Sequence, residues 1–120
     1  MVGTVLIVDD DPVTCELLRR LLEKEGFDTE VAANGSEAMT YLGYNPPPCL
    51  ILLDMMMPLM DGWHFLSNFR MTPAWSAIPV IIMTGMGVAS PEWAASLGAS
   101  GLLKKPFDAD EVLGPIRELV

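Results

Sequence analysis

Residues 50–62 read Leu-Ile-Leu-Leu-Asp-Met-Met-Met-Pro-Leu-Met-Asp-Gly, an apolar run that ends abruptly at a carboxylate. Four consecutive aliphatic residues are typical of a strand buried on both faces, as in a parallel sheet. Such a strand brings Asp54 to its carboxyl end, which is where open α/β sheets bind their ligands. The stretch therefore predicts a parallel α/β fold with Asp54 at its functional edge.

Apolar runs and helix-like stretches alternate along the whole chain. The other strands are expected at residues 4–8, 28–32, 79–83 and 102–104, and each strand is followed by a predicted helix. This pattern predicts one α/β domain over residues 1–120, a doubly wound, flavodoxin-like (βα)5 fold with a parallel five-stranded sheet of order 2-1-3-4-5 and helices on both faces. Gly114-Pro115 falls inside the last predicted helix, where proline removes a backbone donor, so we expect a kink or an early irregularity there.

Composition excludes several classes of function. The 120-residue chain has 16 acidic residues against 7 Lys and Arg, for a net charge of −9. This charge argues against direct binding to nucleic acid or to an anionic membrane surface, since both need a basic face. The sequence shows no membrane-spanning run and no signal peptide, so a cytoplasmic location is expected. Cys15 and Cys49 lack motif spacing and are expected to be buried, reduced thiols.

Polar residues gather where the predicted strands end. Asp9 and Asp10 follow the first strand, Asp54 ends the third, Thr84 ends the fourth, and Lys105 follows the fifth. In a sheet of this order the ends are neighbours, so three carboxylates would meet in one cleft. Because close carboxylates repel one another, a divalent cation is expected to bind between them.

These residue types suit phosphoryl transfer. A carboxylate beside Mg²⁺ and lysine can attack phosphorus and form an acyl phosphate, with Asp54 as the nucleophile. Lys105 and the metal would neutralise charge on the phosphoryl oxygens, and Thr84 could donate a hydrogen bond to the product.

Four segments together make the chain similar to the receiver domains of two-component response regulators, over essentially its whole length. They are Val8 to Pro12, Asp54 to Gly62, Thr84-Gly85 and Lys105-Pro106-Phe107. The resemblance implies a signalling domain that catalyses only its own Mg²⁺-dependent phosphorylation and dephosphorylation. Its implied phosphoryl donor is a histidine kinase or a histidine phosphotransfer protein.

The resemblance also implies roles for individual residues. Asp54 would be the phosphoacceptor. Asp10 would bind Mg²⁺ (or Mn²⁺) directly, Asp9 mainly through water, and Met56 through its backbone carbonyl, with Asp54 completing the metal site. Lys105 matches the lysine of the family because it directly precedes Pro106, and the family has a cis peptide bond at this position.

The chain departs from the family at Leu102, where members usually have an aromatic ring three residues before the lysine. That ring turns inward as the equivalent of Thr84 moves, so this coupling cannot be carried over intact. We still expect Thr84 to move, because a phosphoryl group adds charge and strong acceptors. Family members often form homodimers through the last two helices and the fifth strand, and Leu102 and Pro115 alter that surface. The resemblance does not identify the kinase or the target, and leaves open a stand-alone regulator or a domain of a larger protein.

Two other functions compete with the phosphorylated receiver. Asp9-x-Asp11 after a strand also fits the haloacid-dehalogenase hydrolases, with Asp9 as nucleophile and Asp11 as acid/base. That family needs a late pair of aspartates, which is missing here, and it leaves residues 54–62 unexplained. The other alternative is a receiver-like interaction module that works without phosphorylation.

The remaining polar, sulfur-containing and aromatic residues are assigned structural roles. Asp11 and Asp61 are expected to cap helices. Lys104 is expected to be a solvated charge, and His64 to lie at the surface or to be partly buried. The methionines of residues 55–60 are expected to pack around the site. Partial packing is also expected for Trp75 and Trp93.

Overall fold

The computed structural model describes residues 3–120, in which five parallel strands form one sheet of order β2-β1-β3-β4-β5. The strands are β1 (Thr4–Val8), β2 (Asp28–Ala32), β3 (Leu50–Asp54), β4 (Val80–Thr84) and β5 (Gly101–Lys104). The helices are α1 (Pro12–Lys24), α2 (Gly35–Tyr44), α3 (Gly62–Arg70), α4 (Pro91–Ser96) and α5 (Ala109–Leu119), with a short 3-10 helix η1 (Pro73–Trp75). The predicted fold class and strand order are confirmed.

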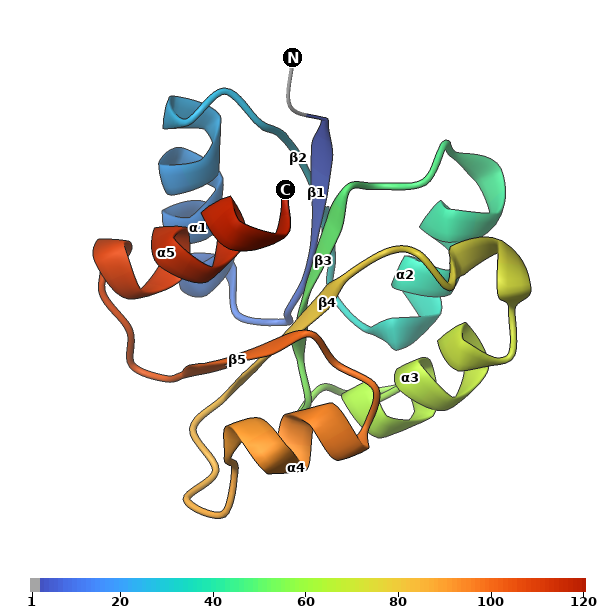
Figure 1. Ribbon diagram of the computed structural model, residues 1–120. Helices are drawn as coiled ribbons and strands as arrows, with labels where there is room; N and C mark the ends of the chain where they lie inside the picture. The colour runs from blue at the N-terminus through green and yellow to red at the C-terminus, as the bar shows by residue number, and fades with distance from the viewer. Residues whose placement is uncertain (1–2) are drawn as a thin grey trace.

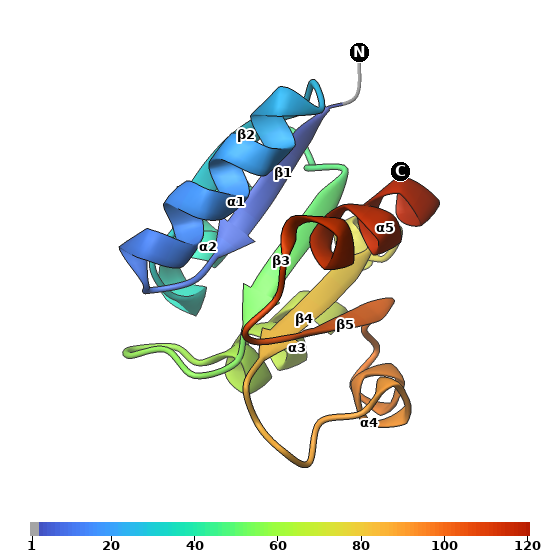
Figure 2. The same cartoon turned by 90° about the vertical axis from the view of Figure 1, so that its left-hand side faces the viewer.

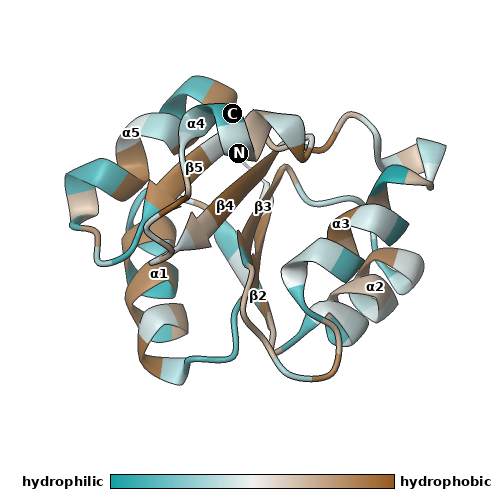
Figure 3. Cartoon of the chain, turned by 90° about the horizontal axis from the view of Figure 1, so that it is seen from below, coloured by the Kyte–Doolittle hydropathy of each residue, from teal (hydrophilic) through white to brown (hydrophobic). Residues whose placement is uncertain are grey.

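The sheet is the middle layer of three (Figure 1). One face packs against α1 and α5, through a core cluster that includes Leu18 and Val112. The other face packs against α2, α3 and α4, through a second cluster that includes Phe65 and Ala94. The central strands β3 and β4 are buried along their whole length and are largely hydrophobic (Figure 3). Burial on both faces explains the unbroken aliphatic run that precedes Asp54.

Each of the five α-helices begins at a side chain that accepts a hydrogen bond from the backbone of its first turn. The N-cap residues are Asp11, Asn34, Asp61, Ser90 and Asp108. The predicted caps Asp11 and Asp61 are among them. At Asp108 a full capping box forms with Glu111. Such caps stabilise a helix by about 1 kcal/mol each, and they fix where each loop from the sheet ends.

Two further expectations concern the last helix and the cysteines. Helix α5 continues through Pro115 to Leu119 without an interruption. Cys15 is buried and Cys49 is half-buried, and both thiols are free. Within residues 3–120, the longest helices are too short and too polar to cross a membrane.

The loop between β3 and α3 extends well beyond the end of the sheet (Figure 2). Gly62 anchors its far end, because a Cβ there would lie 2.7 Å from Met55 Cα and 2.9 Å from the Asp54 carbonyl oxygen. At its tip, Leu59 adopts a left-handed φ of 65° and is exposed. The loop therefore leaves the sheet directly at Asp54 and returns against it at Gly62.

Candidate functional site

The strand register aligns the predicted site residues at one edge of the sheet. Val8 pairs with Leu53, and Asp54 pairs with Met83. Thr84 pairs with Lys104. Asp9, Asp54, Thr84 and Lys105 therefore lie at or one residue beyond the carboxyl ends of adjacent parallel strands. Figure 3 shows the molecule from the side of this edge.

Three carboxylates meet there, as the sequence predicts. Asp9, Asp10 and Asp54 each offer an oxygen, and these oxygens all lie within 4.8 Å of one another. Asp9 and Asp54 are only 1% and 6% exposed, whereas Asp10 is exposed. Two buried acids and one open to solvent form a strongly negative site that a cation can enter.

Lys105 supplies the positive charge inside this group. Its Nζ donates a hydrogen bond of 2.8 Å to Asp9 Oδ2 and lies 3.7 Å from Asp54 Oδ1. The Lys105–Pro106 peptide bond is cis, as the family resemblance implies. Lys105 thus links Asp9, from the start of the domain, to Asp54 at its centre.

Electrostatics at the site favour an Asp54 carboxyl that holds its proton more tightly than usual. Burial raises the pKa of Asp54 to about 6, and the charge of Asp9 adds to this effect, while Lys105 opposes it. Burial lowers the pKa of Lys105, but its hydrogen bond to Asp9 and the charges of both aspartates outweigh burial and raise it overall. At neutral pH Asp54 is still mostly ionised and Lys105 is charged.

The donor set fits a small, hard cation. Mg²⁺ prefers carboxylate and carbonyl oxygens and keeps several waters, and here one of the three carboxylates faces solvent. Asp10, Met56 and Asp61 are among the residues that line a cavity of about 340 Å³ beside the acids. The backbone of Met56 lowers the pKa of the Asp54 carboxyl, so Met56 lies next to the acidic group.

The methionines around the site have different surroundings. Met55 is fully buried and packs in the core, whereas Met56 is 64% exposed. Met56 and Met57 line the cavity beside the acids, in line with the expectation that these methionines surround the site. Met55 is buried and Met56 is exposed because the chain turns away from the sheet directly after Met55.

Thr84 is held by the loop that follows it. Its side chain is 2% exposed, and its Oγ1 accepts a hydrogen bond of 3.1 Å from the Met86 amide. The hydroxyl therefore lies at the start of the β4–α4 loop (residues 85–90), at the end of the strand adjacent to β3. Leu102 is half-buried and packs against the core beneath α4.

Lys104 is exposed, as expected of a solvated charge, but it also makes specific contacts. Its Nζ donates hydrogen bonds of 2.6 Å to the Met86 carbonyl and 3.2 Å to the Ala89 carbonyl. Sequence reasoning missed this role because both acceptors are backbone atoms. The available signal was the Lys-Lys pair at the end of a strand, since adjacent residues point to opposite faces of a sheet.

Asp11, Asp61 and His64 take no part in the acidic group. Asp11 accepts hydrogen bonds from the Val13 amide and the Thr14 hydroxyl. Asp61 accepts from the His64 amide, and the His64 ring is exposed beside it. The two acids thus serve as helix caps.

Residues 5–117 match the model of the response regulator receiver domain family. The chain belongs to this family. It is 35% identical to response regulator Rre1 of Synechocystis sp. over 119 residues, which is 98% of this chain and 51% of that protein. It is 40% identical to a CpxR homolog, a transcriptional regulatory protein of Haemophilus influenzae, over 97% of this chain and 49% of that protein.

Solved receiver structures have the same fold. Chemotaxis response regulator CheY4 of Vibrio cholerae superimposes with a TM-score of 0.89 at 28% identity, and all of both chains is covered. The signal receiver domain of a signal transduction histidine kinase from Syntrophus aciditrophicus gives 0.86 at 32% identity, covering 98% of this chain and 89% of that one. The chain spans about half the length of the curated relatives that it matches.

Proposed function

We propose that this receiver domain accepts a phosphoryl group on Asp54 from a histidine kinase or a histidine phosphotransfer protein, and passes the resulting conformational change to an attached output domain or a separate target. The observation that carries the proposal is the contact of one lysine with two buried carboxylates at the sheet edge. Lys105 lies 2.8 Å from Asp9 and 3.7 Å from Asp54. We place this function in the cytoplasm.

In the proposed reaction, an Asp54 carboxylate oxygen attacks the phosphorus of a phosphohistidine. A new O–P bond forms, the P–N bond breaks, and its electron pair stays on the imidazole nitrogen of the donor. The raised pKa of Asp54, about 6, leaves it ionised at neutral pH but more basic than an ordinary aspartate, which favours attack. The Lys105 ammonium group would stabilise the negative charge that develops on the phosphoryl oxygens, because it already lies between Asp9 and Asp54.

Asp9, Asp10, Asp54 and the Met56 carbonyl would hold Mg²⁺ or Mn²⁺. When bound, the metal supplies positive charge for the phosphoryl oxygens. The hydrogen bond from Lys105 to Asp9 orients the lysine beside Asp54 before a phosphoryl group arrives. The Thr84 hydroxyl would donate a hydrogen bond to a phosphoryl oxygen on Asp54.

The competing functions are less well supported. A dehalogenase-type hydrolase needs Asp11 as a free acid/base, but this carboxylate is engaged by Val13 and Thr14 at the helix start. A module that works without phosphate would not need the buried Asp9, Asp54 and Lys105 group, whose burial is costly without a function.

Incubation with Mg²⁺ and acetyl phosphate, followed by intact mass measurement, tests the proposal. We expect one phosphoryl group on the wild type and on Asp28→Ala, which removes an exposed carboxylate from the edge strand. Asp54→Ala should take up none. Equal labelling of Asp54→Ala and wild type would show that the acceptor is another residue.

A further inference from the structure

The two lysines at the end of β5 serve different sides of the sheet. Leu103 points into the core beneath α1 and α5, while Leu102 packs on the α4 side. Lys104 therefore points to the α4 side and Lys105 to the acidic site, as strand alternation requires. Only Lys105 is used in the function proposed above.

Lys104 joins both ends of a turn in the β4–α4 loop. Its Nζ donates to the carbonyls of Met86 and Ala89, and the Ala89 amide donates to the same Met86 carbonyl at 3.2 Å. In the part of the chain that the structure describes, no carboxylate lies within 4.0 Å of this ammonium. Its charge is thus directed at backbone oxygens, and charge-assisted hydrogen bonds are stronger than neutral ones.

Met86 connects this lysine to Thr84 through the two peptide groups that flank its Cα. On one side of the loop, the Met86 carbonyl accepts from Lys104, and on the other the Met86 amide donates to Thr84 Oγ1 at 3.1 Å. A hydroxyl that accepts a hydrogen bond from a fixed direction still has one proton to donate elsewhere. Fixing Met86 therefore restricts where the Thr84 proton points.

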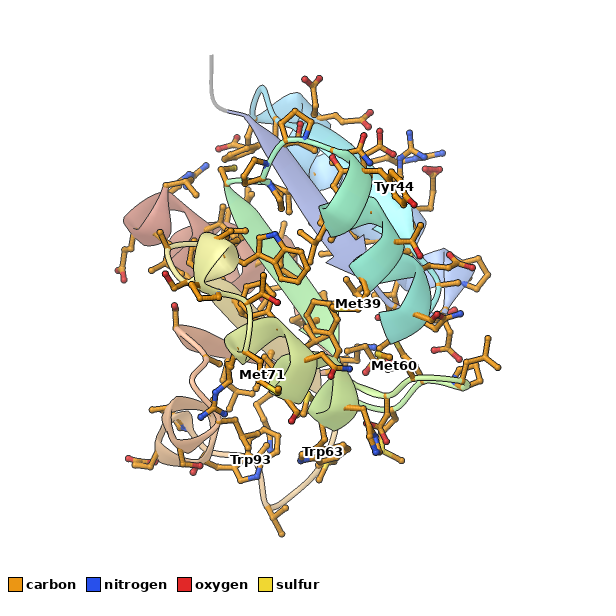
Figure 4. All side chains as sticks on the ribbon, turned by 90° about the vertical axis from the view of Figure 1, so that its right-hand side faces the viewer. Met39, Tyr44, Met60, Trp63, Met71 and Trp93 are labelled. Atoms are coloured by element: carbon orange, nitrogen blue, oxygen red, sulfur yellow. The ribbon has the colours of Figure 1, made fainter. Side chains whose placement is uncertain are left out.

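The rest of α4 is held independently of Lys104. Arg70 donates a hydrogen bond of 2.7 Å to the Leu97 carbonyl at its far end. Trp63 and Trp93 meet edge to face, with ring centroids 6.4 Å apart (Figure 4). While α4 contacts α3 in this way, Lys104 is a side chain of β5 that contacts the loop between Thr84 and α4.

We propose that Lys104 is a positioning residue for Thr84. It holds the Met86 carbonyl and, through the backbone of Met86, keeps the Met86 amide on the acceptor side of the Thr84 hydroxyl, which leaves the hydroxyl proton for a phosphoryl oxygen on Asp54. The inference rests on the proposed function, because it concerns a phosphoryl group at Asp54. Leu102 carries no polar group, so the polar link between β5 and this loop runs through Lys104.

Binding of beryllofluoride, a mimic of the phosphoryl group, tests the inference. The titration uses Mg²⁺, and bound fluoride is followed by ¹⁹F NMR. Lys104→Met should weaken binding about fivefold, because the loop loses two charge-assisted hydrogen bonds. Lys104→Arg, which keeps a cationic donor, should stay within about twofold of wild type, as should the control Lys24→Met, an exposed lysine on α1.

A double-mutant cycle separates positioning from a general structural effect. If Lys104 acts through the Thr84 hydroxyl, Lys104→Met should have little further effect in a Thr84→Ala background. Faster amide exchange in residues 85–90 of unphosphorylated Lys104→Met, with unchanged exchange in the strands, would support the same link. If Lys104→Met does not fold, Lys104→Gln takes its place in both measurements.

Two results would overturn the inference while the proposed function stands: Lys104→Met binding beryllofluoride as well as wild type, or the same loss with and without the Thr84 hydroxyl. Failure of the proposed function looks different. In that case the wild type itself neither binds beryllofluoride nor takes up label at Asp54, and the role of Lys104 toward phosphate fails with it.

Discussion

At the residue scale, the Asp54 carboxyl is under two opposing influences. Burial and the nearby Asp9 favour its neutral form, whereas Lys105 favours the charged form, and burial is the largest effect. The fold thus keeps a charged carboxylate in a place where its charge is unfavourable. A cation or a phosphoryl oxygen bound to Lys105 would change that balance directly.

Asp54→Asn should therefore stabilise the metal-free protein, and more so at higher pH. The folded pKa of about 6 lies above the unfolded value of 3.8, so stability contributed by protonated Asp54 is complete below pH 3.8 and is lost as the pH rises through about 6. The gain of Asp54→Asn over wild type should increase by up to about 3 kcal/mol between pH 4 and pH 7.5. Urea unfolding in EDTA measures it, and a gain that does not change with pH would mean that Asp54 titrates normally.

The two lysines show how far single residues can be predicted. Lys105 was predictable because it directly precedes Pro106 at a strand end, where the family motif places its lysine. The contacts of Lys104 were harder to predict, because the Lys-Lys pair indicates only that the two lysines point to opposite faces, and its acceptors are carbonyl groups that every residue carries. The exposure of Met56 was also hard to predict, since the path of the loop after Met55 depends on tertiary contacts.

At the scale of elements, the positions of helix starts and strand ends were the features that the sequence predicted best. Asp11, Asp61, Ser90 and Asp108 mark helix starts by a local rule, because a short polar side chain satisfies the first free amides. The unbroken helix through Pro115 was less predictable. Packing of Val112, Leu113 and Ile116 against the sheet outweighs the missing hydrogen bond.

Two glycine substitutions should have opposite effects on stability. A Cβ at Gly114 in α5 meets nothing within 4 Å, so Gly114→Ala should raise the free energy of unfolding by up to about 1 kcal/mol. A Cβ at Gly62 would clash with the backbone of Met55 and Asp54, so Gly62→Ala should lower it by about 2 kcal/mol. Thermal unfolding measures both.

Because Gly62 packs on Asp54, its substitution should also slow labelling by acetyl phosphate. Labelling at the wild-type rate would show that the loop can shift without disturbing Asp54.

At the scale of the whole molecule, the parallel order β2-β1-β3-β4-β5 places the acidic site near the middle of the sheet, where the carboxyl ends of β1 and β3 are neighbours. The order was predictable because five alternating strands and helices leave few other arrangements. The close approach of the three carboxylates followed from the order alone. Their unequal burial did not, because it depends on how the loops close over the strand ends.

Binding of a divalent cation should stabilise the whole domain. A ligand that binds only the folded state raises the free energy of unfolding by about 1.4 kcal/mol at ten times its dissociation constant. Mg²⁺ should therefore raise the Tm of the wild type. Asp10→Asn, which changes an exposed carboxylate of the proposed metal site, should lose most of the effect, while Asp28→Asn should keep it. An equal Mg²⁺ response in all three proteins would point to general screening of the net charge of −9.

The hydrogen bond between Lys105 and Asp9 joins residues 96 positions apart. During translation, both buried acids leave the ribosome well before the lysine that compensates their charge. A growing chain therefore carries Asp54, the proposed acceptor, for part of its synthesis without the lysine that lies beside it in the folded domain. An incomplete chain should be unable to accept a signal, so phosphate on Asp54 would also report that the domain has been made and folded in full.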